Sequence, residues 1–294
     1  MSDLRGYQVV ISPALSTPAG RGHSAYFPPA PWTGGVVGAQ LWAVLKGRDR
    51  FEDANAVERA LLLANASRQA LAQRERWASL PPPTADADVQ GPVADAVIKR
   101  LVTDSAEPAR AAGPVPVENP SAGLIVTLDR RGQTVACGVT LNGLFGTGRI
   151  AAGTGVLLAT APGAGGSGAA MITPVIMFDE YAREFFFAGA AAGGIAAPAA
   201  LNLVAATTRL LERPLDEAMA VKRLVGAPDD QTFVEDGMAA DVLAGLRGQG
   251  QAVRVVPSLG RVAAINCVAS IPDNPETCVA VTDPRGAGLA LVAE

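Results

Sequence analysis

Apolar residues in the second half of the chain gather in short runs separated by turn residues, a pattern typical of β-strands. Two nearly continuous apolar runs, 122–128 and 134–141, flank a turn at 129–132 and predict a hairpin whose strands are buried on both faces. Further runs predict strands at 171–178, 184–189, 232–234, 252–256, 261–269 and 278–282. Because the strands come in runs with helices between them, we expect a largely antiparallel α+β fold.

Helical spacing of apolar residues predicts helices in both halves of the chain. They are expected at 36–45, 54–79, 93–102, 195–211, 215–222 and 238–247. Asp53 is the expected N-cap of the longest helix, and Arg68 and Arg74 are expected on its outer face. A strand at 7–11 is expected to lead into a long loop rich in proline, glycine and serine.

Residues 185–208 carry no charged side chain and are numerous enough to span a bilayer. That stretch contains several glycines, Pro198 and many alanines, which insert poorly into a membrane. We therefore expect a buried strand, a glycine turn and a buried helix instead.

Residues 106–121 contain four prolines and show little periodicity, which makes them the best internal boundary. We therefore expect a first region at 1–105 (a strand, a loop and helices), a linker at 106–121 and a domain at 122–294.

The composition excludes several classes of function. The chain has 294 residues, with 24 Lys and Arg against 28 Asp and Glu, and the net charge of −4 argues against a nucleic-acid surface. One histidine, His23, and three cysteines are too few for a multi-histidine or four-thiolate metal site, so we expect no metal and no other cofactor. If the protein is an enzyme, its nucleophile is expected to be a hydroxyl or a terminal amine.

Several short motifs follow one another from about residue 120 to residue 290. They are Val126–Gly132, 139–142, 145–148, 153–158, 192–194, 234–237 and 283–285. In order and spacing these motifs resemble the γ-glutamyltransferase family of the N-terminal-nucleophile hydrolases. Residues 5–9 and 28–35 look like the closing part of that family's large subunit, which implies that the first half of the large subunit is absent.

The resemblance implies an αββα sandwich, incomplete at its N-terminus, and a γ-glutamyl transferase or hydrolase activity of the kind used in glutathione metabolism. In the family a threonine cuts the chain before itself and then serves as the nucleophile, activated by its own α-amine. The linker that ends at Ser121 is where this autoprocessing would take place, and Thr at position 122 is what the family pattern requires. This chain has Ala122 at the nucleophile position, and alanine has no hydroxyl.

Other family positions are partly kept. Thr140 matches a threonine that supports the nucleophile and Asn142 a substrate-binding asparagine, both expected on one strand and facing the same way, while Gly193 and Gly194 match an oxyanion hole. The same residues also suit a purely structural interpretation. In that case Thr140 and Asn142 are buried polar side chains that hydrogen-bond to the backbone, and the two glycines form a tight turn. The substrate-binding acid of the family falls at an alanine, as do a nearby polar position and a pair of serines: Ala164, Ala161, Ala169 and Ala170.

We therefore expect a γ-glutamyltransferase-like protein without standard glutathione-cleaving activity. One alternative is a non-catalytic homologue, or pseudoenzyme, that binds a small amino compound or a partner chain. A second is an amidohydrolase whose nucleophile is Thr140, or Ser121 if a strand bulge corrects the aim of its side chain. A third is a half-enzyme that pairs with a separately encoded N-terminal segment; neither nucleic acid nor a membrane is an expected partner.

Cys267 and Cys278 flank a turn at 272–275 and either form a disulfide or remain two buried thiols. A disulfide would suit the periplasm, where bacterial members of the family occur. The residues after Met1 show no signal peptide, which as written indicates the cytoplasm. Cys137 is expected to be a small core residue.

Overall fold

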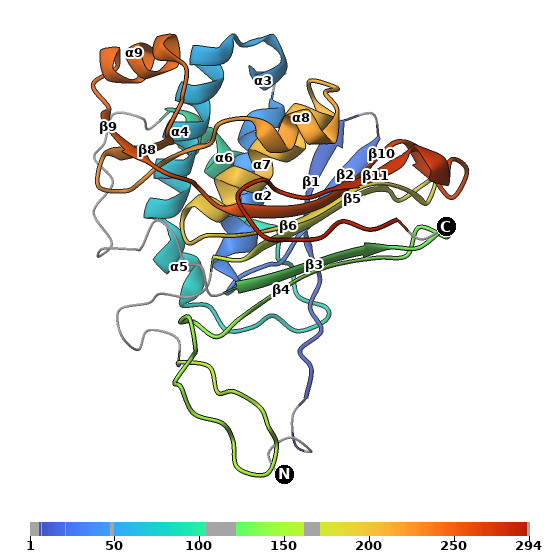
Figure 1. Ribbon diagram of the computed structural model, residues 1–294. Helices are drawn as coiled ribbons and strands as arrows, with labels where there is room; N and C mark the ends of the chain where they lie inside the picture. Colours follow the sequence, from blue (N-terminus) through green and yellow to red (C-terminus); the bar gives the residue numbers. More distant parts are fainter. Residues whose placement is uncertain are drawn as a thin grey trace.

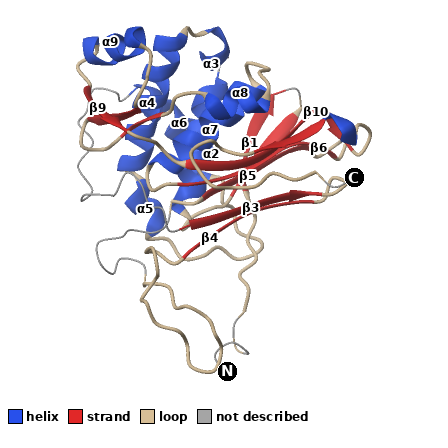
Figure 2. Cartoon of the chain, viewed as in Figure 1, coloured by secondary structure: helices blue, strands red, loops and turns tan. Residues whose placement is uncertain are grey.

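In a computed structural model, the strands of the residues that the structure describes form three sheets (Figures 1 and 2). The structure describes residues 6, 8–20, 22–47, 50–103, 122–161 and 171–292. The largest sheet has six strands, in the order β1 (Leu15–Gly20), β2 (His23–Phe27), β5 (Thr173–Asp179), β6 (Glu184–Ala192), β10 (Arg261–Ile271) and β11 (Cys278–Val281). The second is the hairpin of β3 (Ala122–Leu128) and β4 (Thr134–Thr140), and the third contains β7 (Leu224–Gly226), β8 (Gln231–Glu235) and β9 (Ala252–Val256).

The helices follow the predicted order. They are α2 (Thr33–Lys46), α3 (Arg50–Asp53), α4 (Ala56–Ala72), α5 (Arg74–Ala78), α6 (Asp95–Thr103), α7 (Ala196–Arg209), α8 (Leu215–Ala220) and α9 (Ala240–Gly248), with short 3₁₀ turns η2 (Gly91–Val93) and η4 (Pro275–Thr277). Neighbouring strands of the six-stranded sheet are all antiparallel, as predicted, whereas β8 and β9 run parallel.

The six-stranded sheet is covered on both faces. Helices α2 and α7 pack on one face, and the β3–β4 hairpin lies on the other, against β5, β6 and β10 (Figure 1). Strand β6 is buried from Phe185 to Ala192, because it lies between the helices and the hairpin. Such double burial accounts for a continuous apolar run in an antiparallel sheet, where one wet face would otherwise impose alternation.

Helix α2 approaches the sheet so closely that glycines are required along its contact side. A Cβ atom on Gly34 would lie 2.2 Å from the carbonyl oxygen of Ile172, and one on Gly38 would lie 2.6 Å from the Thr173 side chain. The small side chains of this chain therefore allow close backbone packing, and few aromatic residues are needed to fill the core.

We expect Gly34→Ala to destabilise the protein by about 1–3 kcal/mol, because the added methyl group meets rigid backbone that cannot move aside. Gly248→Ala, at the end of α9 with no atom within 4 Å of the added Cβ, is the matched control and should be neutral or slightly stabilising. Urea unfolding of both variants is the measurement, and equal stabilities would show that α2 is not held this tightly.

Two buried ion pairs join the three-stranded sheet to the segment that follows β11. Arg223 Nη1 lies 2.8 Å from Asp283 Oδ2, and Arg285 Nε lies 2.5 Å from Glu235 Oε1. Burial by itself raises the pKa of Glu235, but hydrogen bonds from Arg285 and from the backbone N–H groups of Arg223 and Leu259 outweigh it and hold that pKa below its usual value. The Glu235 carboxylate thus holds together the segments that contain Arg223, Leu259 and Arg285.

Glu235→Gln should lower stability at pH 7 by about 3–5 kcal/mol, since it leaves buried Arg285 without its nearest carboxylate. Because the folded-state pKa of Glu235 is depressed, its contribution is present above the unfolded value near 4.5 and is lost as the pH falls through the folded value. Denaturant unfolding from pH 7 down to about 2.5 should therefore show, below about pH 4.5, a shallower loss of stability for Glu235→Gln than for the parent. Glu217→Gln, which breaks an exposed pair with Arg213, should change stability by less than about 1 kcal/mol.

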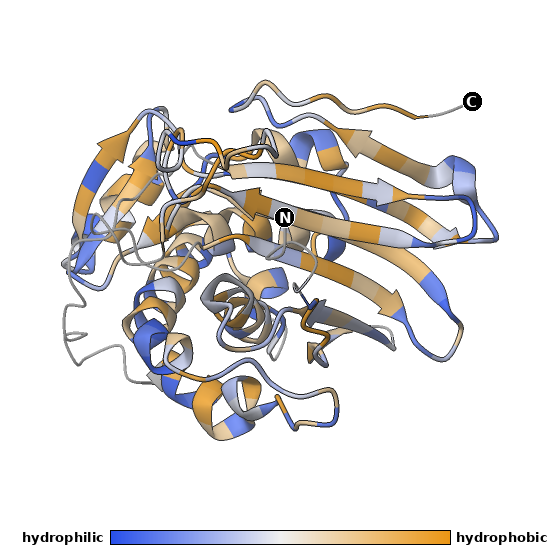
Figure 3. Ribbon diagram, turned by 90° about the horizontal axis from the view of Figure 1, so that it is seen from below, coloured by the Kyte–Doolittle hydropathy of each residue, from blue (hydrophilic) through white to orange (hydrophobic). Residues whose placement is uncertain are grey.

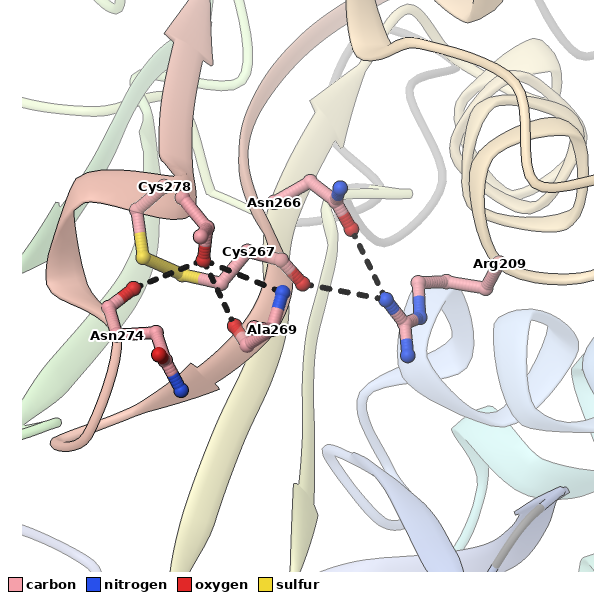
Figure 4. Close-up of a disulfide and its surroundings, with 7 residues drawn as sticks. Arg209, Asn266, Cys267, Ala269, Asn274 and Cys278 are labelled. Atoms are coloured by element: carbon pink, nitrogen blue, oxygen red, sulfur yellow. Dashed lines mark hydrogen bonds between the residues drawn. A yellow bond between two sulfur atoms is a disulfide. The ribbon is translucent and has the colours of Figure 1, made fainter.

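Cys267 and Cys278 form a disulfide between β10 and β11, the first of the two alternatives that the sequence allows (Figure 4). The same hairpin is joined to the helical layer, because Arg209 Nη1 at the end of α7 lies 3.3 Å from the carbonyl oxygen of Cys267.

Residues 185–208 form β6, a glycine turn and most of α7, as predicted. Among the described residues, every helix is too short or too polar to cross a bilayer.

Three expectations about local structure are wrong. Residues 8–14 form no strand, and the expected loop contains the β1–β2 hairpin. The helix expected at 54–79 is interrupted at Gln73 and is capped by Asn55, whose side chain accepts the Glu58 N–H while Glu58 accepts the Asn55 N–H. Two arginines that were expected on its outer face, Arg68 and Arg74, are buried instead, and Arg68 reaches Thr232 in β8 at 3.0 Å.

The third concerns the β3–β4 hairpin, which was expected to be buried on both faces. Its inner side packs on the six-stranded sheet, but Ile125, Val135 and Val139 on the outer side are exposed. An apolar run alone does not distinguish a covered face from one that the described part of the chain leaves open.

Candidate functional site

Residue 122, the expected nucleophile position, lies at the open end of the β3–β4 hairpin. Ala122 begins β3 and is paired directly with Thr140, the last residue of β4. The neighbouring pair, Gly123 and Val139, is exposed, so Ala122 and Thr140 belong to the face that is turned toward the six-stranded sheet. Two of the predicted site residues are therefore brought side by side.

The hairpin crosses β6 so that its open end lies over the end of β6. Val126 and Leu128 pack with Phe185 near the start of β6. At the other end, a Cβ on Gly138 would lie 2.2 Å from the side chain of Ile172, the residue before β5. Since Thr173, the first residue of β5, pairs with Ala191 near the end of β6, the Ala122–Thr140 pair lies toward the end of β6 where α7 begins (Figure 1).

Gly193 and Gly194 form the turn from β6 into α7. Their φ angles are +129° and +58°, values that favour glycine, and their carbonyl groups accept the N–H groups of Ala196 and Ala197. The N-terminus of a 14-residue helix carries partial positive charge and suits an anion or an oxyanion. The turn thus satisfies both the catalytic and the structural interpretation of this glycine pair.

Asn142 lies just beyond β4, in a turn with φ +55°, and not on the same strand as Thr140 as expected. Its N–H donates to Thr140 Oγ1 at 3.0 Å, and its Nδ2 donates to the carbonyl oxygen of Thr160 at 2.9 Å. Thr160 N–H in turn donates to the Leu141 carbonyl oxygen. The asparagine therefore closes the base of the loop that follows β4, and it also touches the candidate support hydroxyl.

Several predicted positions lie outside the described residues: Ser121, Ala164, Ala169, Ala170 and the linker at 106–121. Ala161 is described and exposed. Within the described ranges there is no group of three or more His, Cys, Asp or Glu residues that could hold a metal ion.

Two residues that complete this geometry escaped the sequence analysis. Thr160 holds Asn142 through its backbone carbonyl, which any residue type supplies, so no sequence signal marks it. Ile172 fills the space beside Gly138, and a glycine inside a strand is a known sign of such a close approach.

Chemically, the arrangement offers a hydroxyl on Thr140 and a glycine turn at a helix N-terminus, but a methyl group at residue 122. The groups of clearly shifted pKa, such as Glu235 and Tyr26, lie on other elements. The described part of the candidate site therefore has a hydroxyl at residue 140 and none at residue 122.

The structure is similar to that of a solved acylase. Cephalosporin acylase from Bacillus halodurans is similar with a TM-score of 0.75 and 18% identity, over 100% of this chain and 55% of that chain. Gamma-glutamyltranspeptidase from Pseudomonas nitroreducens complexed with L-DON matches with a TM-score of 0.48 and 21% identity, over 58% of this chain and 99% of that chain. The likeness to the acylase shows that the two chains share an α+β fold.

The particular family follows from the sequence. Residues 1–163 match the gamma-glutamyltranspeptidase family, and this is more than half of the chain. The chain therefore belongs to the gamma-glutamyltranspeptidase family. None of the curated proteins matches it, and it spans 55% of the length of the acylase.

We expect Asn142→Ala to loosen the loop at 141–160, because alanine loses the bond to Thr160 and is strained at positive φ. Limited chymotrypsin digestion at exposed Phe145 should be several times faster than in the parent. Asn142→Gly is the control that keeps the backbone angle and loses only the amide, so it should fall between the two. Unchanged digestion of both variants would contradict the role given to Asn142.

Proposed function

We propose that this chain is a γ-glutamyltransferase-like protein without standard glutathione-cleaving activity. One observation carries the proposal: Ala122 presents a methyl group beside Thr140, at the open end of the hairpin over the β6–α7 glycine turn. A methyl group can neither attack a peptide bond nor carry an acyl group, so self-cleavage and an acyl-enzyme both require a different nucleophile.

The other parts of the site support retention of a binding function. Thr140, Asn142 and the pair Gly193–Gly194 keep the residue types that a γ-glutamyl carbonyl would need around it. We therefore propose a small amino compound, such as a γ-glutamyl or other N-acyl amine, as the ligand class. In this form the protein is a pseudoenzyme of glutathione-type metabolism.

A second candidate function is an amidohydrolase that uses Ser121. It differs in a measurable way, because the chain would then be cut between Pro120 and Ser121, and not before residue 122. For location we propose the periplasm, supported by the Cys267–Cys278 disulfide and by the family.

Ala122→Thr tests the proposal directly. The new hydroxyl should attack the carbonyl carbon of Ser121, the amide nitrogen of residue 122 should leave as an amine, and water should release the upstream fragment as a carboxylate. The parent should remain a single species of 29.9 kDa by intact mass after prolonged incubation at neutral pH, whereas Ala122→Thr should yield two fragments and release a chromogenic amine from a γ-glutamyl anilide.

Ala122→Val is the matched control, since it has the branched shape of threonine without the hydroxyl, and it should remain uncut and inactive. An active, uncut parent would refute the proposal. A parent cut before Ser121 would favour the amidohydrolase.

A further inference from the structure

The turn at the start of the loop after β4 contains a chemically reactive pair of residues. Asn142 is followed by Gly143, and no other asparagine of the chain precedes a glycine. The side-chain carbonyl carbon of an asparagine can be attacked by the backbone nitrogen of the next residue, which closes a succinimide ring. Glycine has no Cβ, so it leaves this nitrogen more accessible than any other residue does. Of all the asparagines in the chain, Asn142 therefore has the most reactive neighbour.

The folded turn leaves both reacting groups uncovered. Among the described residues, none accepts a hydrogen bond from the Gly143 N–H and none donates one to Asn142 Oδ1. Both residues are partly exposed, so water reaches them. Figure 1 shows the loop extending from the hairpin on the side away from the helices, so it faces the viewer in Figure 3, where the molecule is seen from below.

The space around Gly143 also accommodates the reaction. A Cβ atom at residue 143 would lie 3.6 Å from Thr160 Oγ1 and 3.7 Å from the carbonyl oxygen of Gly146, which are ordinary contact distances. Gly143 is therefore not needed for close packing, unlike Gly138 in β4, where an added Cβ would lie 2.2 Å from the Ile172 side chain. The turn can thus change shape at residue 143 without a clash in the sheet.

We propose that Asn142–Gly143 is a site of spontaneous deamidation, which converts the loop at 141–160 from a closed, neutral turn into an open, negatively charged one. The Gly143 nitrogen forms a bond to Asn142 Cγ, and the bond from Cγ to Nδ2 breaks. The proton lost from the Gly143 N–H passes through water to Nδ2, which leaves as ammonia. Water then opens the ring, giving aspartate if the new bond breaks and isoaspartate if the original peptide bond breaks.

Either product removes the contact that closes the loop. Asn142 Nδ2 donates to the carbonyl oxygen of Thr160 at 2.9 Å, and a carboxylate oxygen has no hydrogen to donate there, so repulsion between two acceptors replaces the bond. Isoaspartate also adds a methylene group to the backbone directly after β4, which displaces the Asn142 N–H from Thr140 Oγ1, now 3.0 Å away. The modification thus places a negative charge beside Thr140. It goes beyond the proposed function and requires no catalytic residue.

Incubation of the purified full chain at pH 7 and at pH 9, at physiological temperature, tests the proposal. Mass spectrometry of the tryptic peptide 132–149 should show a fraction that is heavier by about one dalton and grows over days. The fraction should grow faster at pH 9, because the deprotonated nitrogen is the attacking species. Its isoaspartate component should accept a methyl group from L-isoaspartyl methyltransferase. Peptide 51–59 from the same digest contains Asn55 followed by alanine, and it should stay unchanged.

Gly143→Ala is the matched control, since the added methyl group fits the folded turn but hinders the approach of the nitrogen to Cγ. It should keep the melting temperature of the parent and deamidate at least about tenfold more slowly. Asn142→Asp reproduces one of the two products. Chymotrypsin should cut Asn142→Asp and the aged parent at exposed Phe145 several times faster than the fresh parent.

A synthetic peptide with the sequence of residues 138–147 gives the rate without the fold. Conversion of this peptide while the folded parent stays unmodified would overturn the proposal, as would equal rates in the parent and Gly143→Ala. Deamidation that leaves chymotrypsin digestion unchanged would overturn the opening of the loop. These outcomes are distinct from a failure of the proposed function, because a cut chain gives two fragments whereas deamidation leaves one chain of nearly the same mass.

Discussion

The whole architecture depends on the burial of β6 between two layers. The helices α2 and α7 shield one side of this strand, and the β3–β4 hairpin shields the other. Because β6 is apolar on both sides, neither layer can leave without exposing it to water. The same arrangement places the end of β6, the glycine turn and the open end of the hairpin together, so the candidate site is a consequence of how the core is closed.

Much of this architecture could be predicted from the sequence, for a physical reason. Local patterns predict strands that are bounded by clear turns, such as β3 and β4 around 129–132. They also predict the uncharged segment that forms β6 and α7. The β1–β2 hairpin did not, because Pro18 and Gly20 interrupt β1; a proline is tolerated there since β1 is an edge strand of the sheet. The burial of Arg68 could not be predicted either, because Ala227 and Thr232, which its side chain reaches across the core, are more than 150 residues away along the chain.

The candidate site, like the fold, could be predicted from the sequence only in part. Family resemblance placed Ala122 and Thr140 near each other, and the hairpin register pairs them directly. The position of Asn142 depended on where β4 ends, and its positive φ turn removes it from the alternation of the strand. Strand periodicity therefore predicts which residues share a face only as far as the last ladder hydrogen bond, and binding residues often lie one or two positions beyond it.

The two faces of the hairpin raise separate questions, although they belong to the same two strands. The inner face, which carries residue 122, packs on the six-stranded sheet, and the outer face exposes Ile125, Val135 and Val139. Neighbouring residues on a strand point to opposite sides, so selection can change one face while the other is kept. In this chain the inner face carries a methyl group at position 122, while the outer face is rich in β-branched apolar residues. A family member that no longer needed the fold at all would be expected to replace the exposed valines and isoleucine with polar residues, because exposed apolar strands carry a cost in aggregation.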